Sequence, residues 1–250
     1  MNIWQLFQIE LFKTKRTHIL PLLLLAPFLV VISGIANISR YFTPDYTEPW
    51  KAMFIQSALV YAYYFLPFSL IVVCAMVIVK EHRQGGSRKM GTLPISRFKL
   101  GLAQFGVLVW FLVLELLLFF LIFSIAGWIT MYRLHLNQGL PIGYLSLWCL
   151  KLFVSMLPCL ACIWTLFVWF EKPVLAIGFN VLLVIPSVLV ANTPLWAWYV
   201  QDYAGYLVSL ALHDFSAPIN ISYWPIFLDF GISFIIWLSL GLWRFVKAEW

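Results

Sequence analysis

Charged residues are scarce in this sequence of 250 residues. Only 10% of the chain is Asp, Glu, Lys or Arg, whereas 63% is hydrophobic; a soluble domain usually carries about 25% charged residues. The apolar residues stand in long blocks along the entire chain. A soluble fold of this length has no interior large enough to bury them, so the composition excludes a soluble protein. It predicts one membrane domain that comprises residues 1–250.

The motifs of ATP hydrolysis and of common hydrolases are absent. No G-x-x-x-x-G-K-[ST] phosphate-binding loop occurs, and Gly85–Gly86 is followed by residues 87–89 without the required spacing. H-E-x-x-H and G-x-S-x-G are also missing, and the four histidines stand on different segments. We therefore expect no enzyme activity, no catalytic residue, no metal site and no cofactor bound by this chain.

The four cysteines, Cys74, Cys149, Cys159 and Cys162, lie inside apolar blocks. A disulfide framework would place them in polar loops instead. Cys159 and Cys162 form a C-x-x-C without a histidine nearby. We expect no structural disulfide, and we interpret this pair as small packing residues.

Six segments are long and apolar enough to cross a bilayer as helices, which takes about 20 mostly apolar residues each. The expected spans are residues 19–38, 54–79, 100–128, 144–170, 173–191 and 223–246. The sequence therefore predicts an all-α integral membrane protein. Proline removes a backbone donor and kinks a helix, and it stands inside the expected spans at Pro27, Pro67, Pro158 and Pro186.

Positive charges are divided unequally between the two sides of these spans. With a cytoplasmic N-terminus, twelve Lys and Arg residues fall on the cytoplasmic side, and four (Arg40, Lys51, Arg133 and Lys151) fall elsewhere. Because Lys and Arg are enriched in cytoplasmic loops, both termini are predicted to be cytoplasmic. The net charge of +6 then reflects orientation in the bilayer, and it gives no reason to expect nucleic acid as a partner.

Two further segments lie at the edges of the predicted membrane domain. In residues 1–17, Ile3, Trp4, Phe7 and Leu11 recur at helical spacing between polar residues, which favours an amphipathic helix on the cytoplasmic leaflet. Residues 192–222 contain an apolar stretch too short to cross the bilayer. This region is either an ordinary outer loop or a pair of re-entrant helices.

Three ionisable residues fall inside the expected spans: Glu115, Lys151 and Asp229. Such groups cost at least about 2.5–3.5 kcal/mol in the membrane, so they face the protein interior and find partners. Lys151 and Asp229 lie at similar depth below the outer side, which predicts an ion pair between them. Glu115 is either a helix-packing carboxyl or a group with a proton or substrate role.

The cytoplasmic stretch between the second and third spans carries the most informative motif. Glu81 is followed twelve positions later by Leu93-Pro94-Ile95-Ser96-Arg97. This arrangement resembles the coupling segment of type-two ATP-binding-cassette (ABC) exporter permeases. The motif Glu10-x-x-Lys13-x-Lys15-Arg16 resembles the opening of one branch, the lantibiotic-immunity permeases that protect bacteria from bacteriocin peptides. The sequence departs from the pattern at Arg88, where such permeases often carry an aromatic residue, and at Gln104, where they often carry a lysine.

This resemblance covers the whole chain and implies a half-transporter in the bacterial plasma membrane. Its partners would be a separate cassette ATPase that binds ATP and Mg²⁺, a second permease copy or a paralogue, and the lipid bilayer. The coupling segment would comprise residues 80–99, with Glu81, Met90, Leu93, Pro94 and Arg97 at the ATPase contact. Met90 and Leu93 would insert into a groove of the ATPase, Pro94 would end a short helix, and Arg97 would hold the lipid headgroups.

The function implied by this resemblance is export of an amphipathic compound, namely a lantibiotic or other antimicrobial peptide, which gives self-protection or resistance. One alternative is an ABC permease for another drug or for a lipid. A second alternative is a membrane immunity or sensor protein that binds its ligand without transporting it. An intramembrane enzyme would require paired polar catalytic residues, which the sequence does not offer.

Overall fold

The computed structural model describes residues 2–15, 19–38, 48–83, 96–134, 139–170, 172–216 and 224–247. Within these ranges all the regular secondary structure is helical, and six helical segments are long and apolar enough to cross a membrane. The all-α architecture with six candidate spans is therefore confirmed. The elements in chain order are α1 (Ile3–Thr14), α2 (Ile19–Ala36), α3 (Pro49–Val60), η2 (Tyr61–Phe65), α4 (Leu66–Arg83), α6 (Arg97–Leu134), α7 (Ile142–Trp169), α8 (Pro173–Val184), α9 (Ser187–Ala191), η3 (Pro194–Trp198), α10 (Tyr203–Ser216) and α11 (Trp224–Lys247).

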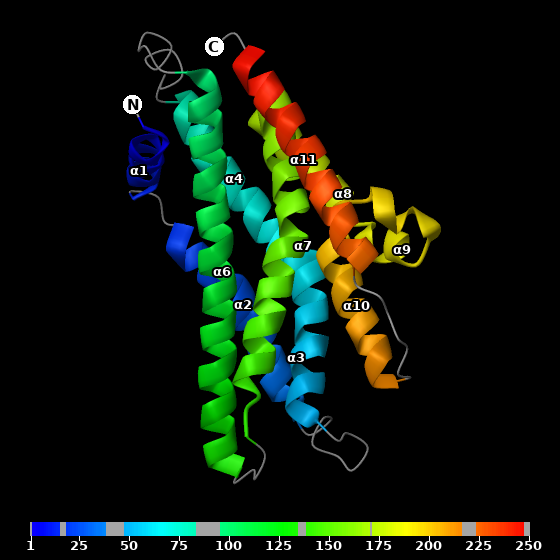
Figure 1. Ribbon diagram of the computed structural model, residues 1–250. Coiled ribbons are helices and arrows are strands. Elements are labelled where there is room, and N and C mark those ends of the chain that lie inside the picture. Colours follow the sequence, from blue (N-terminus) through cyan, green and yellow to red (C-terminus); the bar gives the residue numbers. More distant parts are fainter. Residues whose placement is uncertain are drawn as a thin grey trace.

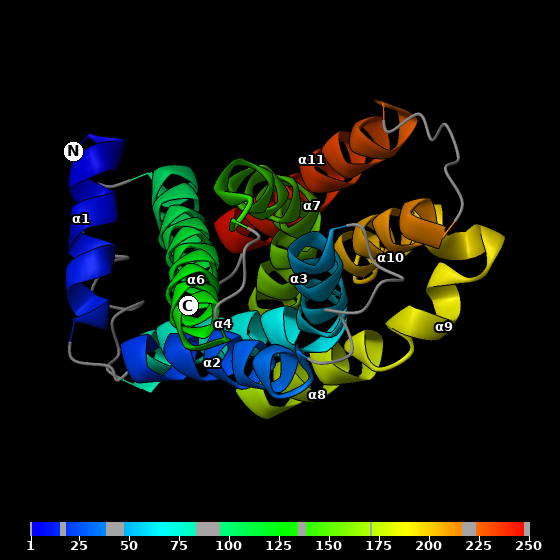
Figure 2. The same ribbon diagram turned by 90° about the horizontal axis from the view of Figure 1, so that it is seen from below.

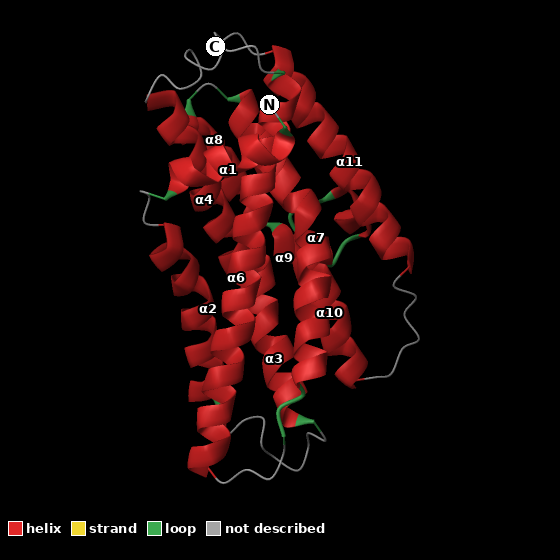
Figure 3. Ribbon diagram, turned by 60° about the vertical axis from the view of Figure 1, so that its left-hand side comes forward, coloured by secondary structure: helices red, strands yellow, loops and turns green. Residues whose placement is uncertain are grey.

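The long helices form one bundle, with α6 and α7 running almost its full length and α2, α3 and α4 packed beside them (Figure 1). α11 lies along α7, and α10 covers the side of α3 and α7. Figure 3 shows α2 and α11 on opposite flanks of this bundle. α1 and the C-terminal end of α11 lie at the same end of the molecule as the end of α4 and the start of α6.

Several helices extend past the expected span boundaries. The third span was expected over residues 100–128, and the helix runs from Arg97 to Leu134. The second begins at Pro49 instead of residue 54. Backbone hydrogen bonds continue a helix into the polar headgroup region, where Lys and Arg side chains reach water, so the hydrocarbon boundary does not end it. Hydropathy therefore located the spans but understated the length of the second and third, while the first is two residues shorter than expected.

The second span contains one turn of π-helix, η2, between α3 and α4. The N–H of Leu66 bonds to the carbonyl of Tyr61, five residues back, and not to residue 62. Pro67 follows directly and has no N–H to donate, so the regular α-helical ladder is interrupted at this point. The predicted distortion at Pro67 therefore takes the form of a π turn, which rotates the side chains of α4 relative to those of α3.

The other three prolines behave in two ways. Pro27 and Pro158 stand inside the continuous helices α2 and α7. Pro186 lies between α8 and α9, and α9 is only five residues long. The fifth span thus breaks near its end, and the chain continues through η3 into α10.

Both peripheral segments contain helices. α1 lies across the bundle: in Figure 2, which looks along α6, α1 is seen lengthwise. The region 192–222 contains η3 and α10, and α10 packs against α3, α7 and η2. The placement of α1 at the bilayer surface and of residues 192–222 within the membrane stay predictions.

The core of the bundle is apolar and aromatic, and the outward faces of several helices are apolar as well. Phe54, Phe119, Phe123, Tyr61 and Trp164 are among the largest fully buried side chains. Leucine, isoleucine and phenylalanine side chains on α2, α8 and α11 are exposed. Exposed apolar faces around a closed interior are the arrangement expected of helices surrounded by lipid.

Candidate functional site

The expected coupling residues are only partly within the described structure. Met90, Leu93 and Pro94 lie outside the described residues. The backbone of Glu81 belongs to the last turn of α4, and Arg97 begins α6. These two helix ends lie at the end of the bundle that also holds α1 and the end of α11 (Figure 1).

Arg97 connects α6 to α11 at this end. Its Nη1 donates a hydrogen bond of 3.3 Å to the backbone carbonyl of Val246, in the last turn of α11. The last carbonyls of a helix lack intrahelical donors and carry partial negative charge, so a guanidinium is a suitable partner. One turn further along α6, Gly101 brings the helix close to Phe245 and Leu242 of α11. The start of α6 and the end of α11 are therefore in direct contact.

Trp164 of α7 is fully buried at the junction of α6, α7 and α11. Its indole N–H donates to Oε1 of Gln104 on α6, at 3.1 Å, and its ring stacks with Phe245 of α11. A Cβ atom at Gly241 of α11 would lie 2.6 Å from the Trp164 ring. The next residue, Thr165, donates to its own helix at Ala161 and also contacts the Trp237 carbonyl of α11, at 2.9 Å. We call the set Gln104, Trp164, Thr165, Gly241 and Phe245 the three-helix joint.

The joint includes Gln104, the position where the sequence departs from the lysine common in similar permeases. A lysine at this buried position would not accept the indole N–H, because an ammonium group is only a donor. The apolar periodicity of the third span gave no sign that Gln104 meets Trp164, since the two residues are 60 positions apart. The sequence analysis did not single out this joint.

α1 packs against α6 with a face that overlaps the expected apolar one only in part: Phe7 and Leu11 are half-buried against the core, and Ile3 and Trp4 are exposed. Its buried residues are Leu6, Glu10 and Thr14, which recur every four residues. Glu10 is paired with Lys13, whose Nζ lies 2.5 Å from the carboxylate. Trp4 and Phe12 are 63% and 71% exposed. The buried face thus carries a paired carboxylate, and aromatic side chains are left on the outside of α1, where they suit an aromatic-rich membrane interface.

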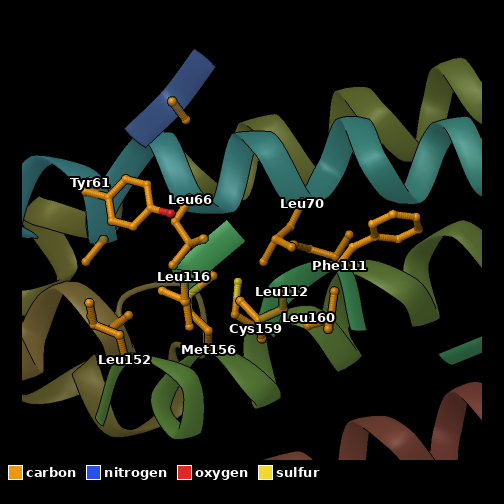
Figure 4. Packing of buried hydrophobic residues seen from close by; sticks show 14 of the residues in the cluster. Tyr61, Leu66, Leu70, Phe111, Leu112, Leu116, Leu152, Met156, Cys159 and Leu160 are labelled. Carbon is orange, nitrogen blue, oxygen red and sulfur yellow. The ribbon is translucent and has the colours of Figure 1, made fainter. Parts of the chain in front are cut away.

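Glu115 of α6 is completely buried in the middle of the bundle. Its polar neighbours are the hydroxyls of Tyr61, from η2, and Ser69, from α4. The carboxylate oxygens and both hydroxyls form no hydrogen bond of regular geometry within the described residues. Tyr61 stacks on Phe119 at 4.4 Å between ring centroids, and Figure 4 shows it beside the leucine layer formed by Leu66, Leu116 and Leu152. Glu115 thus meets the π turn of the second span.

Lys151 and Asp229, the expected ion pair, lie on the neighbouring helices α7 and α11. The ammonium of Lys151 lies 4.5 Å from the ring centroid of Trp148. Asp229 acts electrostatically on Tyr203, whose hydroxyl lies 2.8 Å from Oγ of Ser233 on α11. The ion pair itself stays a prediction.

A second polar cluster lies where α7 meets the start of α10. Sγ of Cys159 donates to Oε1 of Gln201 at 2.8 Å, and Nε2 of Gln201 lies 3.8 Å from Sγ of Cys162. Both cysteines are free and buried, so the C-x-x-C packs against an amide as an ordinary pair of small residues. Among the described residues, no three Cys, His, Asp or Glu side chains are grouped in a way that would hold a metal ion.

Asp202, which directly precedes α10, is fully buried next to this cluster. Its two carboxylate oxygens have no hydrogen-bond partner within the described part of the chain. Burial raises the pKa of Asp202 to about 8, because the ionised form loses its water. The sequence analysis placed this residue in the region 192–222, an outer loop or a pair of re-entrant helices, and did not single it out. The neighbouring Trp196, Tyr199 and Tyr203 were the available signal that this region is packed and not solvated.

Comparison with known proteins identifies the class of this bundle. Residues 6–187 match the family described as ABC-2 family transporter protein, and this match covers well over half of the chain. No curated protein matches the chain. The matched family consists of membrane permeases that lack ATPase activity of their own and act with an ATPase partner. The six candidate spans agree with this match. The chain therefore belongs to the ABC-2 family, as a multi-pass permease subunit of an ABC transporter.

Proposed function

We propose that this permease belongs to a bacterial exporter that removes an amphipathic antimicrobial peptide of the lantibiotic type from the plasma membrane and so gives self-protection or resistance. Both termini are cytoplasmic in this proposal. ATP and Mg²⁺ are bound by the separate ATPase subunit. A second copy of the chain, or a paralogue, completes the pathway.

One observation carries the ATPase-docking part of this proposal: α1 and the ends of three other helices gather at one end of the bundle. These are α1, the end of α4, the start of α6 and the end of α11 (Figure 1). Basic residues mark this end, among them Arg97, Lys99, Arg244 and Lys247. A positively charged end faces the cytoplasm, where the ATPase resides. This arrangement supports a docking surface formed by α1 and the segment 80–99.

The connected helix ends suggest how ATPase movement reaches the transmembrane part. A push on residues 80–99 acts on α4 and α6 together. From α6 it passes to α11 through Arg97 and to α7 through Gln104 and Trp164. In α4 it reaches the π turn η2 and its contact with Glu115. Two packed states of these contacts are required for such a transmission to act as a switch.

The amphipathic peptide fits the proposed function because it is already in the membrane when it meets the transporter. Peptides of this kind lie in the outer leaflet with their apolar face among the acyl chains. Export then means lowering their concentration in the bilayer, which needs no passage from the cytosol. The same reasoning applies to an amphipathic drug or lipid, the alternative substrates.

The docking proposal is tested with Leu93→Asp, because a carboxylate in an apolar groove of the ATPase would lose its water without gaining a partner. The candidate ATPase is recovered from membranes with the tagged permease, and recovery is normalised to the amount of permease. We expect at least a tenfold loss of ATPase recovery (~1.4 kcal/mol). Gly139→Asp is the control, since Gly139 is exposed and, among the described residues, no atom lies within 4 Å of its would-be Cβ. Undiminished recovery by Leu93→Asp would rule out this docking segment.

The proposed orientation is tested by cysteine labelling of intact cells with a membrane-impermeant maleimide. Single cysteines at Arg88 and Lys247 should be labelled only after the cells are opened, and cysteines at Pro44 and Asp214 should be labelled from outside. The native cysteines are buried or half-buried, and they are replaced by serine or alanine in the background. Labelling of position 88 in intact cells would show that the topology is the opposite of the proposed one.

Survival assays distinguish the exporter from a non-transporting immunity or sensor protein. Under the proposal, cells are protected against the peptide only when the ATPase hydrolyses ATP. A Walker-motif variant of the ATPase that binds but does not hydrolyse ATP should abolish protection. Full protection with this inactive ATPase would favour the non-transporting alternative.

A further inference from the structure

Several helices meet at the start of α10. Gln201 contacts the two thiols of the C-x-x-C on α7. The hydroxyl of Tyr203 donates to the carbonyl of Ala197 in η3, at 2.5 Å, and it lies 2.8 Å from Oγ of Ser233 on α11. The start of α10 is therefore held by α7, η3 and α11 at once. We call four of its residues the α10 junction: Gln201, Asp202, Tyr203 and Gly205.

Gly205 brings the α10 junction against the π turn of the second span. A Cβ atom at Gly205 would lie 2.3 Å from both Cδ1 and Cε1 of Tyr63, so the backbone of α10 lies directly on this ring. Tyr63 belongs to η2 and is only 4% exposed. The π turn continues into α4, whose end reaches the segment 80–99. Separation of α10 from the bundle would therefore uncover the π turn.

Asp202 places an acidic group in this tightly packed junction. Its side chain is fully buried, and within the described ranges neither carboxylate oxygen has a hydrogen-bond partner. An ionised carboxylate in such a place has lost its water and gained no partner in exchange. Burial accordingly raises the pKa of Asp202 to about 8. The packed junction therefore keeps a proton on Asp202 at neutral pH.

The titratable groups around Asp202 are mostly hydroxyls and thiols. They belong to Tyr63, Tyr199, Tyr203, Tyr206, Cys159 and Cys162. Burial raises the pKa of Tyr199 to about 12, and it also raises the pKa values of Tyr203 and Tyr206. These hydroxyls stay uncharged between about pH 4 and 8 and offer Asp202 no positive charge.

The charged side chains of the helices packed against α10 do not neutralise Asp202 either. Lys51 of α3 forms an ion pair at the start of its own helix, and the ammonium of Lys151 on α7 lies over an aromatic ring. His213 is eleven residues further along α10, about 16 Å away at 1.5 Å per residue. Asp229 of α11, which acts on Tyr203, has the same sign of charge as Asp202. A bound proton is therefore what keeps Asp202 neutral.

We propose that Asp202 takes up a proton when the start of α10 packs on the π turn and releases it when the two separate. In the packed state the carboxyl is neutral. In the separated state water reaches the carboxyl, its pKa returns to about 4, and the proton passes to water. The ratio of separated to packed molecules then rises about tenfold per pH unit between about pH 4 and 8. Proton release is thereby linked to the π turn and to α4.

Distances between two spin labels test this coupling in the complete permease in lipid nanodiscs. Labelled cysteines replace Trp198 of η3 and Val60 of α3, which are 88% and 49% exposed. η3 precedes α10 and α3 precedes the π turn, so the label distance follows their separation. The native cysteines are replaced, with serine at Cys159 to keep a donor for Gln201. We expect a short distance at about pH 5 and a second, longer one whose share relative to the short one grows about tenfold per pH unit up to about pH 8 and then levels off.

Three variants separate the proton from the packing. Asp202→Asn keeps the junction neutral, so the short distance should persist at all pH values between about 5 and 9. Gly205→Ala adds a methyl group against the Tyr63 ring and should favour the longer distance at every pH, while the dependence on pH is retained. Asp229→Asn removes a carboxyl from the neighbouring helix α11 and should leave the wild-type pH dependence in place.

Three results would overturn the proposal. The first is a label distance that does not change with pH in the wild-type permease, and the second is an equal pH dependence in Asp202→Asn. The third is loss of helical circular dichroism near pH 8 in place of a discrete longer distance, because the separated state has to be folded. None of these readouts involves the exported compound, so failure of the proton coupling leaves peptide export standing, and failure of export leaves the coupling standing.

Discussion

The guanidinium of Arg97 and the backbone carbonyl of Val246 hold the start of α6 against the end of α11, with 3.3 Å between Nη1 and the oxygen. The two residues are 149 positions apart, yet they stand at the two helix ends nearest the predicted ATPase contact. Their hydrogen bond joins these two ends directly.

Arg97→Gln should therefore weaken the proposed transmission of ATPase movement from α6 to α11 without unfolding the permease. The pair is exposed, so its loss should lower the thermal midpoint in detergent by no more than about 2–4 °C. We expect normal ATPase recovery but at least a several-fold loss of protection against the exported peptide. Lys99→Gln removes a charge at the same end of α6 and should leave protection intact. Equal losses of protection in the two variants would show that protection needs the positive charge at this end of α6 and not the hydrogen bond of Arg97.

Gly241 should tolerate no side chain. A Cβ atom there would lie 2.6 Å from both Oγ1 of Thr165 and the Trp164 ring, so Gly241→Ala overpacks the three-helix joint by about 1–3 kcal/mol. We expect the thermal midpoint to fall by several degrees. Gly231→Ala is the matched control on the same helix, because no atom in the described part of the chain lies within 4 Å of its would-be Cβ. A similar midpoint for the two variants would mean that α7 and α11 pack less tightly than described.

Glu115 should be replaceable by an uncharged side chain of the same shape. An ionised carboxylate without a cation partner is very costly in an apolar interior, so the packing of Glu115 should not depend on its negative charge. We expect Glu115→Gln to keep normal stability and protection, and Glu115→Lys to prevent accumulation of the permease. If Glu115→Gln accumulates normally but abolishes protection, the carboxyl has a proton or substrate role.

Asp202 should make the stability of the permease depend on pH. Its pKa is about 8 in the folded chain and about 4 when unfolded. Between these values the unfolded chain releases a proton that the folded chain keeps, so stability falls as pH rises from about 4 to 8. Asp202→Asn should flatten this decline and raise the thermal midpoint near pH 8. The exposed Glu48→Gln is the control for loss of one negative charge. An unchanged pH profile in Asp202→Asn would contradict the burial of this carboxyl.

The Lys151 and Asp229 pair is open to a double-mutant cycle. The expected spans place both residues at a similar depth below the outer side of the membrane. If they neutralise each other, Lys151→Gln and Asp229→Asn should each lower the thermal midpoint more than the double variant does. A double variant no better than the worse single one would show that each residue has another partner.

The spans were predictable because the apolar blocks alone determine which segments enter the bilayer. The ends of the helices were less predictable than the spans. α6 extends beyond the apolar block to include Arg97 and Arg133, since helical hydrogen bonding does not stop at the hydrocarbon edge. Pro67 signalled a distortion, but a missing N–H alone does not distinguish a kink from a π turn.

The polar contacts that organise the candidate site were not predictable in the same way. Gln104 meets Trp164, and Gln201 meets Cys159, through packing between segments 60 and 42 positions apart. Periodicity reports which face of a helix is apolar, but it does not report which neighbour that face meets. Asp202 illustrates the same limit: the aromatic residues around it indicate a packed region, but they do not show that the carboxylate itself is fully buried.

The length of α6 has a mechanical consequence. Its 38 residues make a rod of about 57 Å, nearly twice the roughly 30 Å of hydrocarbon that it crosses. If this helix tilts as a rigid body by about 10° around its midpoint, each of its ends moves by about 5 Å, in opposite directions. In such a tilt, Arg97 on one side of the bilayer and Arg133 on the other are displaced by similar distances in opposite directions.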